Sequence, residues 1–146
     1  MLGLWSFVRF VHVLSAMVWV GGQLTLTALL LPVVRARLTA GERSGLTREI
    51  GRRFGVYTIV VFLPVQVGTG ALLAWREHVT FASLTHPGYG QTLLAKLTVF
   101  ALVLIASGAH GWAQGTGHSR LARGLALGSL IGSVVVVLFA TALPGT

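Results

Sequence analysis

The sequence predicts an all-α membrane protein, a four-transmembrane-helix bundle with up-down-up-down order. Composition is the first reason: 54% of the 146 residues are hydrophobic, 10% are charged, and the mean hydropathy is +0.82. The second is the succession of apolar runs, each long enough to cross a hydrocarbon core of about 30 Å. The third is that short polar segments join these runs, which favours antiparallel neighbours.

The first apolar run covers residues 4–34 and ends at Pro32 and a basic segment, RARLTAGERSGLTREIGRR. It is too long for a secretory signal peptide, so we expect a retained helix. The second run covers residues 54–75 and contains Pro64 and Gly68, where we expect bends.

A polar loop follows the second run, and its His-Pro-Gly portion is typical of a turn. The third run covers residues 91–112 and the fourth residues 121–143. We expect the four helices to form a single integral membrane domain over residues 1–146.

Basic residues are distributed unevenly between the two sides of the predicted bundle. Most lie between the first and second helices or between the third and fourth, which predicts that these loops are cytoplasmic and both termini are on the outer side. The simplest location is a bacterial inner membrane. The residues of the two basic loops are Arg35, Arg37, Arg43, Arg48, Arg52, Arg53, Arg120 and Arg123. On the other side are Arg9, Arg76 and Lys96.

Several classes of function are disfavoured. The net charge of +8 comes mainly from residues between apolar runs, so it indicates membrane topology rather than nucleic-acid binding. The chain has no cysteine, which excludes disulfides, thiolate metal sites and iron–sulfur clusters. Nothing resembles a nucleotide loop or a hydrolase triad. The acidic residues Glu42, Glu49 and Glu77 lie in predicted loops or near helix ends, so no catalytic carboxylate pair is evident.

Polar side chains recur along the first helix at intervals of three or four residues: His12, Ser15, Trp19, Gln23 and Thr27. This spacing places them on one stripe, which we expect to face the bundle interior. An ionisable group inside a membrane is costly, so His12 is a candidate functional residue.

The third helix carries a second stripe through Lys96, Val103, Ser107 and His110. Lys96 and His110 share a face but stand about 21 Å apart along the axis. With the predicted topology, His12 and Lys96 are level in the outer half, whereas His110 lies near the cytoplasmic end. We therefore do not expect His12 and His110 to ligate one haem together.

Each of these residues has a structural alternative to its functional interpretation. His110 could be a hydrogen-bonded packing residue, and Lys96 could extend to the outer surface instead of lying near His12. The loop residues His78 and His86 lie on the same predicted side as His12. They are either solvated or join His12 in a three-imidazole site.

The fourth helix has glycines at four-residue spacing, which lets another backbone approach closely. We expect this ridge to pack within the bundle, with an interface to a second copy or to a larger membrane complex as the alternative. The ridge consists of Gly124, Gly128 and Gly132.

Three segments in the same order resemble motifs of the CopD-type copper resistance or copper export family. HVLSAMVWVGG resembles its first motif, a His followed after six residues by Trp-x-Gly-Gly. RRFGVYTIVVFLPVQVGTG is similar to its Arg-Phe segment leading to a Thr-Gly pair, and YGQTLLAKL to its Tyr-Gly-x-x-Leu-Leu-x-Lys-Leu motif. Family members are often longer, and some are fused to a copper-binding periplasmic domain.

This chain has His110-Gly111 where the CopD-type family frequently carries Asn-Arg. That His, with the preceding Lys96, also resembles the HemJ family of haem-binding membrane proteins, although the spacings differ. The two resemblances imply copper handling as the first interpretation and haem-based redox chemistry as the second.

The copper interpretation implies a metal site on the outer side, with His12 as the first ligand and His86 or His78 as partners. Lys96 and Trp19 would shape the pocket, and Arg53 would organise the cytoplasmic mouth near His110. The two methionines are Met1 and Met17, and Met17 lies off the His12 face, so a soft cuprous cage is not evident. The alternatives are a haem b protein with His12 or His110 as its single axial ligand, and a structural subunit of a larger membrane complex. None of these three interpretations establishes whether the protein is an enzyme.

Overall fold

The structure is a computed structural model that describes residues 3–142, apart from the side chains of residues 119 and 142. The described residues form helices and no strand. Four helical stretches among them are long and apolar enough to cross a membrane, which confirms the all-helical prediction and the four spans: Leu4–Arg37, Ala40–Arg76, Tyr89–Gly115 and Arg120–Thr141. The chain divides into two compact units, residues 1–77 and residues 78–146.

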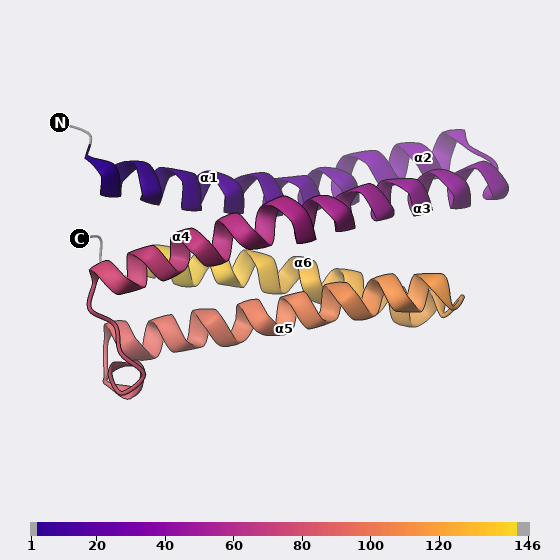
Figure 1. Ribbon diagram of the computed structural model, residues 1–146. Coiled ribbons are helices and arrows are strands. Elements are labelled where there is room, and N and C mark those ends of the chain that lie inside the picture. The colour runs from indigo at the N-terminus through magenta and orange to yellow at the C-terminus, as the bar shows by residue number, and fades with distance from the viewer. Residues whose placement is uncertain (1–2, 143–146) are drawn as a thin grey trace. The chain divides into compact units, whose positions relative to one another are not determined.

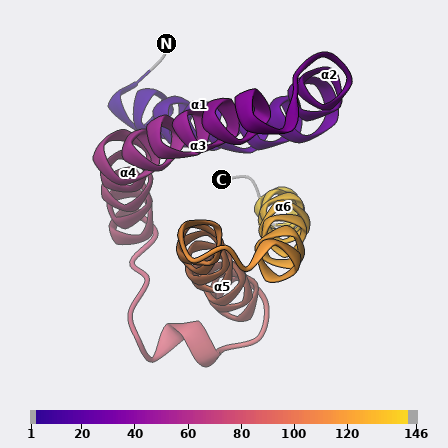
Figure 2. The same ribbon diagram turned by 90° about the vertical axis from the view of Figure 1, so that its right-hand side faces the viewer.

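The first unit is a hairpin of two long helical stretches that run antiparallel (Figures 1 and 2). The outgoing stretch consists of α1 (Leu4–Thr25), the π-helical turn η1 (Leu26–Leu30) and α2 (Leu31–Arg37). The returning stretch consists of α3 (Ala40–Tyr57), the π-helical turn η2 (Thr58–Phe62) and α4 (Leu63–Arg76).

Each π-helical turn ends just before a proline. Pro32 is the second residue of α2, and Pro64 is the second residue of α4. A proline inside a helix has no N–H to donate and its ring crowds the preceding turn. Widening that turn relieves the crowding, and the N–H groups of Leu31 and Leu63 donate five residues back, to Leu26 and Thr58. The helices therefore continue through both prolines.

The basic segment is helical rather than a loop, which differs from the expected boundaries of residues 34 and 54. The outgoing stretch ends at Arg37, and α3 begins after only Leu38 and Thr39. A capping box starts α3: the Thr39 N–H donates to Glu42 Oε2 at 3.0 Å, and the Thr39 side chain accepts from the backbone of Glu42. At 1.5 Å per residue the two stretches are about 51 and 55 Å long, so their basic ends extend beyond a hydrocarbon core of about 30 Å.

The second unit is also a helical hairpin, formed by α5 (Tyr89–Gly115) and α6 (Ser119–Ala142), with the short 3₁₀ helix η3 (Ser83–Thr85) before α5. The α5 stripe of Val103, Ser107 and His110 faces α6, as the spacing predicts. Ser107 Oγ and Ser129 Oγ are 2.7 Å apart, and His110 Nδ1 donates to the Ala122 carbonyl at 2.7 Å.

The α6 glycines do not share one environment. A Cβ at Gly132 would overlap Val103 Cγ2, so this glycine packs within the hairpin as expected. A Cβ at Gly124 or Gly128 would meet nothing within 4 Å. The interhelical contact of the ridge is therefore confirmed for one of its three members.

We predict that Gly132→Ala destabilises the protein by about 1–3 kcal/mol, because the added methyl group overpacks the contact with Val103. Gly128→Ala is the matched control, since its methyl group enters open space and alanine is the better helix former. Thermal unfolding in detergent measures both variants. Equal midpoints for the two variants would contradict the close α5–α6 contact.

Candidate functional site

A cluster of hydrogen-bonded polar side chains joins α1 to α4. His12 Nδ1 lies 2.8 Å from Thr69 Oγ1, and His12 Nε2 lies 3.1 Å from Gln66 Nε2. Ser15 Oγ donates to Gln66 Oε1 at 2.6 Å and approaches the His12 carbonyl at 3.0 Å. We call these four residues, His12, Ser15, Gln66 and Thr69, the His12 cluster.

The geometry of the His12 cluster assigns its hydrogens. Thr69 has one hydroxyl hydrogen, and the Val65 carbonyl at 2.5 Å takes it because a carbonyl oxygen only accepts. Thr69 Oγ1 therefore accepts from His12, which puts a hydrogen on Nδ1. The Nε2 atom of the neutral imidazole then has a lone pair, and Gln66 turns its amide NH₂ group toward it. Gln66 Oε1 is left to accept from Ser15, so every bond in the cluster has one donor and one acceptor.

The position of Trp5 and Trp75 indicates how deep the His12 cluster lies in a bilayer. These two rings pack 6.2 Å apart at one end of the hairpin, and the Arg76 guanidinium lies 5.4 Å above the Trp5 ring. Tryptophan beside arginine is typical of a membrane interface. His12 is seven residues along the helix from Trp5, hence about 10 Å into the hydrocarbon. Polar groups at that depth are costly unless they bond one another, as these do.

Trp19 forms a separate layer of the same helix–helix contact. Its ring is buried and stacks on Phe62 at 4.4 Å, and its indole N–H donates to Thr58 Oγ1 at 3.0 Å. Trp19 lies two turns beyond His12, about 10 Å along the axis. It therefore sets the spacing of the two helices.

The predicted stripe on α1 is confirmed for His12, Ser15 and Trp19, and the contact then continues through Gly22, against which Phe54 packs. Steps of three and four residues in alternation keep one face toward a partner, whereas repeated steps of four rotate around the helix. Thr27 accordingly has an exposed side chain.

One glycine of each of the three motifs lies at a close contact within its own unit. A Cβ at Gly22 would stand 3.0 Å from Phe54 Cε2, and one at Gly70 would stand 3.3 Å from His12 Cε1. A Cβ at Gly90 would overlap the Ser83 carbonyl oxygen. In each case a side chain in place of the hydrogen would push the neighbouring group away.

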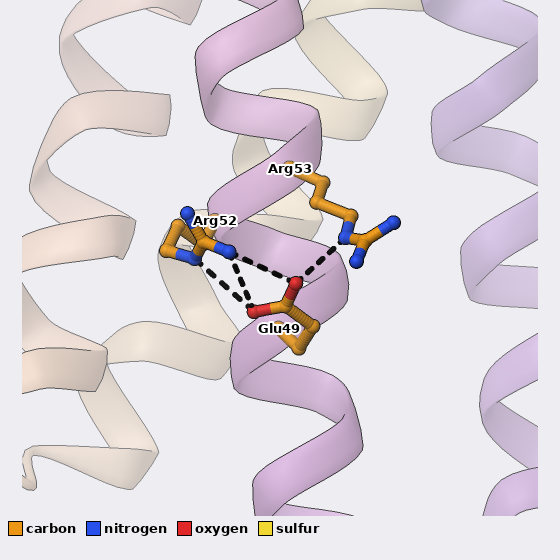
Figure 3. Close-up of polar contacts among 3 residues, drawn as sticks. All are labelled: Glu49, Arg52 and Arg53. Carbon is orange, nitrogen blue, oxygen red and sulfur yellow. Dashed lines mark hydrogen bonds and ion pairs between the residues drawn. The ribbon is translucent and has the colours of Figure 1, made fainter.

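Arg53 lies on the exposed part of α3, next to a shared acid. Arg53 Nε donates to Glu49 Oε1 at 2.6 Å, and Arg52 bonds the same carboxylate at 2.9–3.1 Å from the other side (Figure 3). Exposed pairs of this kind contribute about 1 kcal/mol or less.

The remaining candidate residues belong to the second unit. Lys96 is half-buried on α5, and His110 bonds the Ala122 carbonyl of α6, which is the packing role considered for it. His78 adopts a positive φ of 52° just after α4, and His86 is an exposed residue at the end of η3. Across residues 3–142, no group of three or more His, Asp or Glu side chains is arranged to hold a metal ion.

Comparison with protein-family models, with curated proteins and with solved structures finds no match for this chain. The resemblances to the CopD-type and HemJ families therefore stay predictions.

Sequence reasoning missed Gln66 and Thr58 as members of the helix–helix contact. One available signal was that Gln66 is the single amide in the apolar run of residues 54–75. The π-helical turn explains why the spacing alone did not reveal the pattern. A turn closed over five residues takes up one residue more than an α-helical turn, so Thr58 and Gln66 both face α1, although a regular α-helix would rotate them about 80° apart.

We predict that Thr69→Val lowers the free energy of unfolding by about 1 kcal/mol, because His12 Nδ1–H loses its acceptor inside the membrane. Thr27→Val makes the same chemical change at an exposed position of η1 and serves as the control. Reversible denaturation in mixed micelles measures the difference. A loss of the same size in both variants would show that the His12–Thr69 bond contributes nothing.

Proposed function

We propose that the protein is a CopD-like integral membrane protein that binds and passes a copper ion through the His12 cluster. The observation that carries this proposal is the hydrogen bond from His12 Nδ1 to Thr69. A histidine that ligates a metal almost always donates its other ring N–H to a fixed acceptor, which orients the ring and makes the ligating nitrogen more basic. His12 has this arrangement, with the Nε2 lone pair directed at Gln66.

The donor atoms of the His12 cluster suit a borderline metal ion. Imidazole nitrogen is a good ligand for copper, and the oxygens of Gln66 and Ser15 lie beside it as harder donors. Binding would require the Gln66 amide to leave Nε2 or to turn its oxygen toward the ion. Met17 is exposed on another face of α1, so thioether does not contribute. Such a set favours weak, reversible binding, which suits a transported ion. The choice of copper among the metals that imidazole binds rests on the CopD-type resemblance.

The proposed topology places the His12 cluster nearer the outer side of a bacterial inner membrane. The support is the positive-inside rule: residues 35–53 carry six arginines and two glutamates at the end of the hairpin remote from Trp5 and Trp75. Both termini would then lie on the outer side, and the four spans would run up, down, up and down. His78 and His86 would lie on that outer side as well.

We predict that the purified full-length protein binds Cu²⁺ and that His12→Ala loses this binding, because the cluster has no other nitrogen ligand. His118→Ala is the control, since His118 is exposed and stacks on Trp112 in the second unit. Equilibrium dialysis with metal analysis measures binding, and electron paramagnetic resonance reports a coordinated imidazole nitrogen. Thr69→Val keeps the ligand and should weaken binding about 10-fold or more.

Equal copper binding by His12→Ala and His118→Ala would overturn the proposal. An absorption spectrum of protein from its native membrane tests the alternatives at the same time. A Soret band would indicate haem b, and protein with neither haem nor copper affinity would indicate a structural subunit.

A further inference from the structure

The first unit contains an open groove of about 490 Å³ that the His12 cluster does not use. Both helical stretches of the hairpin line it, with α1 and η1 on one side and α3 on the other. Its lining consists of Gly22, Thr25, Leu26, Ile50, Arg53 and Phe54. Its volume falls within the range of about 300–1,000 Å³ that small-molecule sites occupy.

The lining combines apolar side chains with one cation. Leu26, Ile50 and Phe54 supply a hydrocarbon wall, and Arg53 supplies the charge. The described bonds of Arg53 engage Glu49 through Nε, which leaves the terminal guanidinium nitrogens for another acceptor. A guanidinium fork of this kind suits a phosphate oxygen.

The depth of the groove coincides with a membrane boundary. The rings of Trp5 and Trp75 mark the other boundary at the far end of the hairpin. Twenty residues of helix span about 30 Å, the thickness of a hydrocarbon core. Counting that length from each tryptophan reaches Thr25 on one helix and Gly55 on the other. These residues are at the level of the groove, where lipid phosphates meet acyl chains.

The charge around the groove favours an anion. Residues 35–53 hold six arginines and two glutamates, so the field at this end of the hairpin is positive. Basic pockets beside transmembrane helices bind the headgroups of anionic lipids. A soluble anion would meet the charge but would leave the apolar wall without a partner.

We propose that this groove binds an anionic phospholipid, with the phosphate on Arg53 and the start of an acyl chain against Leu26 and Phe54. The site is independent of the proposed copper function, because its residues and those of the His12 cluster do not overlap. Bound lipid would fill the space between the two helices of the hairpin at the membrane boundary.

The test compares Arg53→Gln with Arg52→Gln in the full-length protein. Both variants remove one charge and one ion pair with Glu49, but only Arg53 lines the groove, and the two side chains extend to opposite sides of that carboxylate (Figure 3). Native mass spectrometry with added dioleoyl phosphatidylglycerol or dioleoyl phosphatidylcholine measures binding. Size-exclusion profiles and tryptophan fluorescence confirm that each variant is folded.

We expect the wild type to prefer phosphatidylglycerol and Arg53→Gln to bind it about 10-fold or more weakly, the effect of losing a charge-assisted hydrogen bond. Arg52→Gln should lose at most the roughly 5-fold that one charge in the surface field is worth. Thr25→Phe, which fills the groove without changing the charge, should also weaken binding.

Three results would overturn the proposal. Equal losses in Arg52→Gln and Arg53→Gln would show diffuse attraction to the basic surface. Full competition by inorganic phosphate would show an ion site without a role for the acyl chain. An unchanged affinity in Thr25→Phe would show that the lipid lies elsewhere.

Discussion

The hydrogen bonds of the His12 cluster fix how α1 and α4 fit together. In a bilayer, lipid is as apolar as leucine, so the hydrophobic effect does not select one pairing of two apolar helices. Polar groups do select one, because a shift in register would leave His12 and Gln66 without partners in hydrocarbon. Once Thr69 and Gln66 hold His12, Trp19 meets Thr58 and Phe62 two turns further on, and Gly22 meets Phe54. The same hydrogen bonds therefore form the candidate site and determine how the two helices pack.

Much of the fold was predictable from the sequence, since four apolar runs and short connections leave few arrangements. The helix ends were not, because the basic segment of residues 35–53 was interpreted as a loop from its polarity. A helix outside the membrane needs only a start signal and local bonds, which Thr39 and Glu42 supply through the capping box. The prolines were expected to end or bend the helices. The first helix continues through Pro32, where an end was expected, and a π-helical turn precedes each of Pro32 and Pro64; no composition rule indicates these turns.

Of the two sides of the candidate site, the sequence predicted the one on α1. The spacing of His12, Ser15 and Trp19 correctly indicated a face directed at a partner helix. All three residues lie on the single helix α1, so helical periodicity relates their positions. Their partners on the returning stretch were not identified, since hydrogen bonds between residues 39 to 57 positions apart leave no local pattern. The structure explains the Thr69–Gly70 pair of the second motif. Thr69 accepts from His12, and the absence of a side chain at Gly70 leaves room for the imidazole ring.

The most direct test of this account is the hydrogen position on His12. Nitrogen-15 NMR of histidine-labelled protein in lipid distinguishes the two neutral tautomers and the imidazolium ion, and the His12 signal is assigned as the one of five that a His12→Asn variant lacks. The account predicts a neutral ring at pH 7 with the hydrogen on Nδ1 and the lone pair on Nε2. A ring protonated on Nε2, or on both nitrogens, would contradict the hydrogen-bond assignment of the His12 cluster and with it the proposed ligand atom.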